Sequence, residues 1–140
     1  MVVLDTNVVS ELMLVAPNQG VLTWIDDWPT RELFVTAVTE AEVRTGVAIL
    51  PVGARRREIG QAAERLIGGL FAGRVLPFDS SAACAYADIA ATRRAAGRPV
   101  SQPDCQIAAI ARSRDMAVAT RNVRDFSETG VEVIDPWLPT

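Results

Sequence analysis

Short apolar runs rich in β-branched residues alternate along the chain with longer amphipathic stretches. The runs have the length of buried strands, which we expect at residues 2–4, 33–36, 75–78, 117–120 and 131–134. Apolar residues recur at helical spacing between them, so we expect helices over residues 8–13, 21–28, 41–50, 55–71, 82–96 and 104–114. Strands that alternate with helices indicate an α/β fold with a mainly parallel sheet. Neither a repeat nor a linker interrupts the 140 residues, so we expect a single domain over residues 1–140.

An aspartate directly follows the first apolar run. Residues 2–4 read Val-Val-Leu, and Asp5 stands where this strand should end, with Thr6 or Asn7 starting a helix. Ligands bind to open α/β sheets at the carboxyl ends of the strands. A carboxylate in that place is costly unless a positive group meets it. Asp5 is therefore either a helix N-cap or part of a ligand site.

Two further acids lie near the starts of expected helices. Glu42 follows Thr39 by three residues, and Asp104 follows Ser101 by three, which is the spacing of a capping box. Alone, either acid is most simply a capping residue. Strand-to-helix junctions of a parallel sheet lie at one edge, so we expect Asp5 and Glu42 to face one crevice. Asp104 opens a helix that comes before the strand expected at residues 117–120, so topology places it there less firmly. Carboxylates gathered in this way repel one another unless a cation is bound.

A fourth polar segment follows the strand expected at residues 117–120. Asn122 offers an amide oxygen to a metal and Asp125 offers a carboxylate, while Arg121 and Arg124 have the charge to meet a phosphate. The alternative for all four is a solvated loop. As ligands, we expect Asn122 to lie nearer the metal and Asp125 to act from further out, through water.

The basic composition narrows the chemistry. The chain has no histidine, and all 14 of its basic residues are arginine. The missing histidine excludes Ser-His-Asp and Cys-His nucleophilic systems and zinc sites with histidine ligands. The missing lysine excludes Walker-A phosphate binding and Schiff-base chemistry. A site with oxygen ligands alone suits a hard ion such as Mg²⁺ or Mn²⁺. The net charge of −3 is compatible with a phosphate substrate that is reached through such a metal.

Five segments, in order, resemble the PIN-domain proteins, and within them the VapC-type toxins of bacterial toxin–antitoxin pairs, nearest the FitB-like branch. They read MVVLDTNVVSE at the start, TAVTEAEVRTG around Glu42, FAGRVLPFD from Phe71, the helix start at Asp104, and ATRNVRDF from Ala119. The Asp-Pro-Trp at residues 135–137 also fits. The resemblance spans essentially the whole chain, and five motifs in register are far more specific than any one of them.

The resemblance implies a Rossmann-like α/β/α sandwich with a central parallel sheet, and an Mg²⁺- or Mn²⁺-dependent ribonuclease. It implies that Asp5, Glu42 and Asp104 are the catalytic acids and metal ligands, with Asn122 or Asp125 in the fourth position. Thr6 and Thr120 match hydroxyl positions near the site. The family also implies a homodimer and a cognate antitoxin that enters the active-site groove.

Other function classes fit the residues less well. A haloacid-dehalogenase-type phosphatase would want an aspartate at position 7, where this chain has asparagine, and a lysine. A response-regulator receiver domain wants a lysine as well. A non-catalytic PIN-like module that acts through a protein partner is a further alternative, against which the three retained acids speak. The chain has neither a long uncharged apolar run nor a basic, then apolar, N-terminus, so we expect a cytoplasmic protein without a membrane span.

Several arginines and tryptophans have two interpretations. Arg93, Arg94 and Arg98 precede the helix of Asp104, where they either line a substrate path or lie on the surface. Trp137 is expected to pack against the body of the protein rather than to stack on a base.

Overall fold

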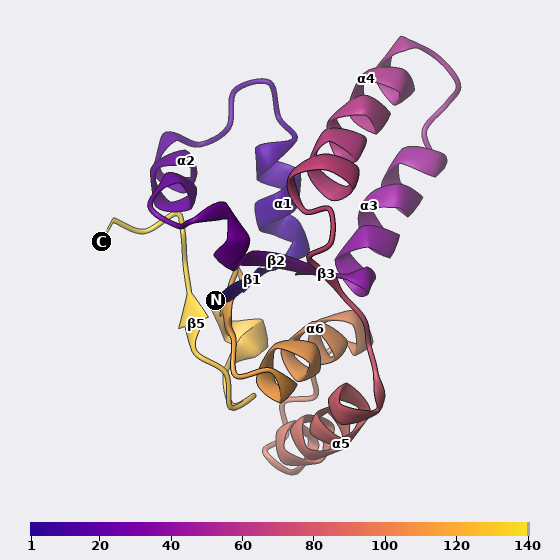
Figure 1. The fold of residues 1–140 in the computed structure, drawn as a ribbon. Coiled ribbons are helices and arrows are strands. Elements are labelled where there is room, and N and C mark those ends of the chain that lie inside the picture. The colour runs from indigo at the N-terminus through magenta and orange to yellow at the C-terminus, as the bar shows by residue number, and fades with distance from the viewer. Residues whose placement is uncertain (140) are drawn as a thin grey trace.

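The computed structural model describes residues 1–139 and is built around a sheet of five parallel strands (Figure 1). The strands lie in the order β3-β2-β1-β4-β5. Their bounds are β1 Val2–Leu4, β2 Leu33–Thr36, β3 Val75–Leu76, β4 Ala117–Ala119 and β5 Val133–Ile134. Central β1 pairs through Val3 with Phe34 of β2 and with Val118 of β4. All five predicted strands are confirmed, and β3 ends early because Pro77 has no N–H to donate to a neighbour.

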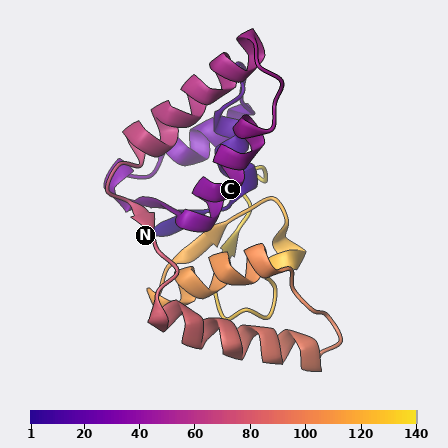
Figure 2. The same ribbon diagram turned by 90° about the vertical axis from the view of Figure 1, so that its right-hand side faces the viewer.

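Helices cover both faces of the sheet, as Figures 1 and 2 show. The α-helices are α1 Thr6–Leu12, α2 Gln19–Asp26, α3 Ala37–Ala48, α4 Ala54–Ala63, α5 Ser80–Ala95 and α6 Gln102–Ser113. Shorter turns are η1 Thr30–Glu32 and η3 Val123–Phe126, and the π-helix η2 Glu64–Leu70 continues α4. Helices α1 to α4 pack on one face, and α5 and α6 on the other, which confirms the α/β/α sandwich. In residues 1–139 no helix is both long and apolar enough to cross a membrane.

Successive residues of β1 point to opposite faces and join two apolar cores. Val2 and Leu4 belong to the core under α1 to α4, whereas Val3 belongs to the core formed with α5 and α6. All three side chains are fully buried. A strand packed on both faces has a fixed register, because a slip of one residue would move every side chain to the wrong core. The carboxyl end of β1 therefore presents the next residue, Asp5, at a defined place.

One predicted helix changes its geometry partway along. The sequence predicted a continuous helix over residues 55–71, but the chain passes from α to π geometry at Glu64. There the Phe71 N–H donates to the Leu66 carbonyl, five residues earlier, at 2.8 Å. This wider turn delivers Phe71 to the interior, where its side chain is fully buried.

Candidate active site

Asp5 lies at the carboxyl end of β1, as the sequence predicted, and is only 4% exposed. It is the N-cap of α1, since its Oδ1 accepts a hydrogen bond from the Thr6 N–H at 2.8 Å. Its Oδ2 accepts from Thr120 Oγ1 at 2.8 Å and from Asn7 Nδ2 at 3.3 Å. The capping role is thus confirmed. Three hydrogen bonds do not use all the lone pairs of a carboxylate, so Asp5 retains the capacity to bind a ligand.

Thr120 and Asn7 join Asp5 to the neighbouring strand. Thr120 directly follows β4, which pairs with β1, so it lies beside Asp5. Asn7 Nδ2 donates to Thr120 Oγ1 at 3.2 Å, and Asn7 Oδ1 accepts from the Arg121 N–H at 3.3 Å. Thr120 is fully buried. The result is a connected polar network where the strand order reverses, the place at which open α/β sheets bind ligands.

Glu42 reaches the same edge from α3, but it is not a capping residue. The predicted capping box from Thr39 to Glu42 is wrong, because Thr36 caps the helix by accepting the Thr39 N–H at 3.2 Å. The helix therefore starts earlier, and Glu42 lies in its second turn. Glu42 Oε1 accepts from Thr6 Oγ1 at 2.7 Å. Because this bond uses the Thr6 proton, Thr39 is the donor in the 3.0 Å contact between the two threonine hydroxyls.

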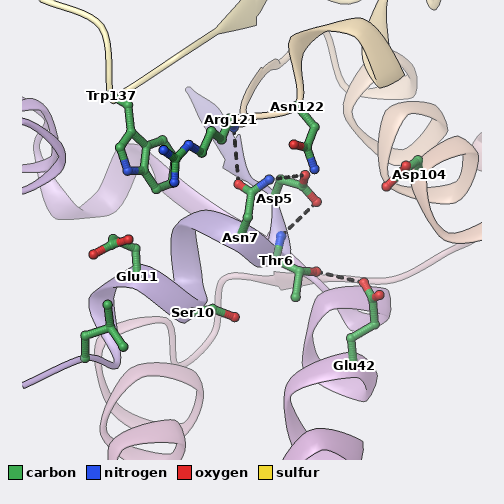
Figure 3. A pocket seen from close by; sticks show the side chains of 11 residues that line it. Asp5, Thr6, Asn7, Ser10, Glu11, Glu42, Asp104, Arg121, Asn122 and Trp137 are labelled. Carbon is green, nitrogen blue, oxygen red and sulfur yellow. Dashed lines mark hydrogen bonds between the residues drawn. The ribbon is translucent and has the colours of Figure 1, made fainter. Parts of the chain in front are cut away.

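Asp104 lies in the first turn of α6, and the predicted helix start is confirmed. Ser101 is the N-cap, and its Oγ accepts the Asp104 N–H at 3.3 Å. Topology alone placed Asp104 less firmly than the other two acids, and the structure brings it to the pocket that Asp5 and Glu42 also line (Figure 3). Burial raises the pKa of Asp104, and the charges of Asp125 and Glu42 raise it further. The acids are therefore close enough to disfavour one another's ionisation.

The carboxyl group of Asp5 is a weaker acid than usual. Burial raises its pKa from 3.8 to about 6. The hydrogen bonds from Thr120 and Thr6 oppose this rise, and the charges of Asp104 and Glu42 add to it. A cation beside Asp5 would lower the pKa again, because an opposite charge favours the ionised form.

The three predicted acids share a pocket of about 480 Å³ (Figure 3). Asn122 lines it too, and its N–H donates to Thr120 Oγ1 at 3.0 Å. Asp125, an exposed residue of η3, is not among the lining residues. Within residues 1–139, no three acidic or cysteine side chains converge closely enough to form a metal cage as they stand. The lining residues are Asp5, Thr6, Asn7, Ser10, Glu11, Leu14, Glu42, Asp104, Arg121, Asn122 and Trp137.

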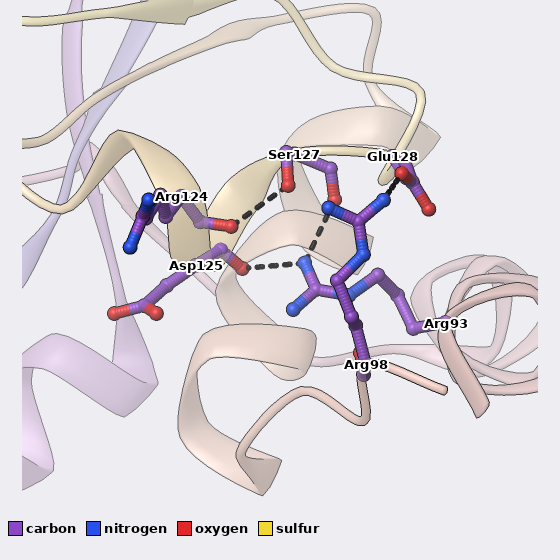
Figure 4. Close-up of polar contacts among 6 residues, drawn as sticks. All are labelled: Arg93, Arg98, Arg124, Asp125, Ser127 and Glu128. Atoms are coloured by element: carbon purple, nitrogen blue, oxygen red, sulfur yellow. Dashed lines mark hydrogen bonds and ion pairs between the residues drawn. The ribbon is translucent and has the colours of Figure 1, made fainter. Parts of the chain in front are cut away.

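Arg93 is a buried residue of α5, neither on a substrate path nor on the surface. Its guanidinium donates to three backbone carbonyls: that of Arg98 at 2.6 Å, that of Asp125 at 3.1 Å and that of Ser127 at 2.7 Å. Figure 4 shows how these bonds join the end of α5 to the η3 segment. Arg93 thereby holds the segment that carries Asp125, and its charge opposes the rise in the pKa of Asp104.

Sequence reasoning missed the roles of two side chains in this site. The sequence pattern marks Asn7 as a helix start and as a departure from the phosphatase pattern, yet its side chain bonds to both Asp5 and Thr120. The spacing predicts Thr39 as a cap, yet its hydroxyl supports that of Thr6. The signal was present in both cases, since polar residues stand in the first helical turn after a buried strand.

The chain resembles PIN-domain proteins over most of its length. A family model described as PIN domain matches residues 2–132. The chain is 42% identical to VapC ribonuclease Y4jK of Sinorhizobium fredii over 139 residues, which cover 99% of each protein. It is 39% identical to toxin FitB of Neisseria gonorrhoeae over 137 residues, which cover 98% of this chain and 99% of that protein.

A solved structure agrees with these sequence matches. The structure of FitAB bound to an IR36 DNA fragment aligns with 100% of this chain and 98% of the other, at 38% identity and a TM-score of 0.92. Likeness in sequence and in fold therefore extends over the same residues, including the strand ends that carry the acids. The chain belongs to the PIN-domain family, in its branch of VapC-type toxins of toxin–antitoxin systems, close to FitB.

Proposed function

We propose that this protein is a divalent-metal-dependent ribonuclease and the toxin of a toxin–antitoxin pair. The observation that carries the proposal is that Asp5, Glu42 and Asp104, which are far apart in sequence, line one pocket at the carboxyl edge of the sheet. A full-length relative described as a VapC ribonuclease supports the reaction. The lack of histidine supports a metal as the source of the nucleophile, because no other side chain here titrates near neutral pH without perturbation.

The side chains in the pocket fit a hard cation. Asp5, Glu42 and Asp104 offer carboxylate oxygens and Asn122 an amide oxygen, and these are the donors that Mg²⁺ and Mn²⁺ prefer. Burial raises the pKa of Asp5 and of Asp104, and the charges of the neighbouring acids add to the rise. A bound cation would oppose both effects. These four residues would hold the ion, with Asp125 further out. When bound, the ion supplies an activated water and stabilises charge on the phosphate.

Hydroxyl groups of the protein orient the acids. Thr120 donates to Asp5 at 2.8 Å, and Thr6 donates to Glu42 at 2.7 Å. Such bonds restrict side-chain rotation and keep lone pairs directed at the ligand position. The N-terminus of α6 adds partial positive charge at Asp104, which favours its ionised form. The chain thereby presents its carboxylates in a fixed arrangement before substrate arrives.

The same pocket suits a protein inhibitor. Carboxylates that line an open pocket form strong charge-assisted hydrogen bonds with arginine, so an antitoxin arginine that reaches Asp5, Glu42 or Asp104 would block the site. The solved FitAB complex supports a partner of this kind, and we include a homodimer of the toxin in the proposal.

The protein free of antitoxin is expected to cut RNA with Mg²⁺ or Mn²⁺ and to stop in excess EDTA. The physical reason is that the residues of the pocket hold the metal but cannot replace it. Gel analysis of total RNA would show cleavage, and sequencing of the new ends would identify the linkage that is cut. Mn²⁺ should also raise the Tm, because a ligand that binds only the native state stabilises it. Cleavage that persists in excess EDTA would refute the metal requirement.

Asn122→Ala is expected to weaken metal binding more than Asp125→Ala does. Asn122 lines the pocket, whereas Asp125 does not. The Mn²⁺ concentration for half-maximal cleavage should rise about tenfold or more for Asn122→Ala. It should rise much less for Asp125→Ala, and the Mn²⁺-induced change in Tm should follow the same order. The reverse order would make Asp125 the ligand.

A further inference from the structure

The pocket has a second chemical feature on the side away from Asp104. Figure 3 shows Arg121 and Trp137 together on this side and Asp104 on the other side, and in this view Asp5 lies between the pair and Asp104. The guanidinium carbon of Arg121 lies 5.2 Å from the centroid of the Trp137 ring, which is a cation–π contact. Both residues line the same pocket as the acids. The pocket thus combines a carboxylate cluster with a cation on an aromatic platform.

Both members of this pair are attached to the fold near the acids. The Arg121 N–H donates to Asn7 Oδ1 at 3.3 Å, and Nδ2 of the same Asn7 side chain donates to Asp5. The Trp137 N–H donates to Asp135 Oδ1 at 2.9 Å, and its partly buried side chain packs against the core under α1 to α4. The expected packing role of Trp137 is therefore confirmed, but the ring also borders the pocket. One asparagine connects the pair to Asp5.

The Arg121 guanidinium has no carboxylate partner among the residues that the structure describes, whose ion pairs all involve other arginines. Glu11 also lines the pocket, but its carboxylate accepts the Asn18 N–H at 2.9 Å. Arg121 is exposed. The unpaired guanidinium suits a ligand with a negative charge. The indole beneath it suits a ligand with a flat ring. A nucleotide has both features.

We propose that Arg121 and Trp137 form a subsite for the nucleotide adjoining the phosphate that is cut. The Arg121 guanidinium binds its phosphate or stacks on its base, and the indole supports the stack. The inference rests on the proposed function, because the acids are taken to mark the reacting phosphate. Arg121 and Trp137 would bind and align the RNA, and neither would contact the metal.

The test separates RNA binding from chemistry. A short single-stranded RNA that the wild type cleaves with Mn²⁺ is mapped, and versions with an abasic residue on either side of the cut linkage are made. Kinetics are measured for Arg121→Gln, Arg121→Lys, Trp137→Leu and Trp137→Phe. Arg31→Gln is the control. Arg31 belongs to η1, which directly precedes β2 and so lies at the amino ends of the strands, whereas the pocket lies at their carboxyl ends. The Mn²⁺-induced change in Tm is recorded for each protein.

Arg121→Gln and Trp137→Leu are expected to raise KM about 5- to 150-fold, the range that corresponds to loss of one base–aromatic stack. Their kcat and their Mn²⁺-induced change in Tm should stay close to wild type. Trp137→Phe should retain most of the binding, which also distinguishes stacking from loss of packing. Arg121→Lys should recover only part of it, because an ammonium pairs with phosphate but cannot stack. An abasic residue on one side of the cut should weaken wild-type binding and have little further effect on Trp137→Leu.

An unchanged KM in Arg121→Gln and Trp137→Leu would overturn the subsite. The subsite would also be overturned if an abasic residue weakened RNA binding equally in wild type and variants. The same holds if Arg121→Lys kept the wild-type KM and an abasic residue had no effect on binding. A wild type that does not cut RNA with Mn²⁺ would instead overturn the proposed function, and the subsite with it. A KM change in Arg31→Gln equal to that in Arg121→Gln would show a general charge effect and would count against the subsite.

Discussion

Asp5→Asn is expected to abolish cleavage and yet to make the metal-free protein more stable at pH 7.5. If Asp5 binds the metal as proposed, its replacement should lower kcat/KM more than about 100-fold, since even residues that only support metal ligands are worth 10- to 100-fold. The gain in stability has a separate cause. Burial raises the pKa of Asp5 from 3.8 to about 6, so the ionised carboxylate disfavours the folded state. An amide carries no charge and escapes this cost.

The pH dependence has a definite sign. The folded-state pKa of Asp5 lies above the unfolded value, so between pH 4 and 6 the native state binds more protons than the unfolded state. The free energy of unfolding therefore falls as pH rises through this window, by about 3 kcal/mol in all. Asparagine removes this loss but cannot accept every hydrogen bond that Asp5 accepts, which costs about 1 kcal/mol. The variant should be about 1–2 kcal/mol more stable at pH 7.5 and slightly less stable at pH 4.

Urea denaturation of both proteins with EDTA at the two pH values measures this crossover. The difference between the proteins isolates Asp5, because the other titrating groups are common to both. A variant that is less stable at both pH values would show that Asp5 serves the fold mainly as the N-cap of α1. In the expected case, added Mn²⁺ should make the wild type the more stable protein at pH 7.5, because only the wild type retains all the proposed ligands.

Local patterns were sufficient to predict the sheet and the position of Asp5. Apolar runs of strand length marked all five strands, and an acid directly after β1 had to lie at the carboxyl edge of the sheet. Glu42 was predicted at the right edge for the wrong reason. The sequence offers two threonines as caps for α3, at positions 36 and 39, and spacing alone could not show that the earlier one forms the bond.

Contacts between distant segments were not predictable in this way. Arg93 stands in an Arg-Arg pair on a helix, which indicates a surface, yet it is 6% exposed. Its guanidinium bonds to two carbonyls more than thirty residues away, that of Asp125 in η3 and that of Ser127 directly after it. The pairing of Arg121 with Trp137 likewise depends on how the chain runs past β5. Periodicity reports which face of an element is buried, but it does not report which distant segment covers that face. This is why the acids were predicted, whereas the contacts made by Asn7, Thr39 and Arg93 were not.

Asp104→Asn and Ser101→Ala are expected to have opposite effects, which separates chemistry from capping at the start of α6. Asp104→Asn keeps the backbone N–H that Ser101 Oγ accepts, so the cap persists. Neutralising a carboxyl group whose pKa is raised by burial and by neighbouring acids should leave the metal-free protein as stable as wild type or more stable. If Asp104 binds the metal as proposed, cleavage should fall more than about 100-fold.

Ser101→Ala is the matched control, because it removes the cap and keeps the carboxylate. It should lower the free energy of unfolding by about 1 kcal/mol, the usual cost of losing an N-cap hydroxyl. Cleavage by the folded variant should stay within a few-fold of wild type, because Asp104 remains in the first turn of α6. Circular dichroism melts and cleavage assays on both variants provide the comparison. If Asp104→Asn instead lost about 1 kcal/mol of stability and still cut RNA, Asp104 would be a capping residue and the metal site would rest on Asp5 and Glu42 alone.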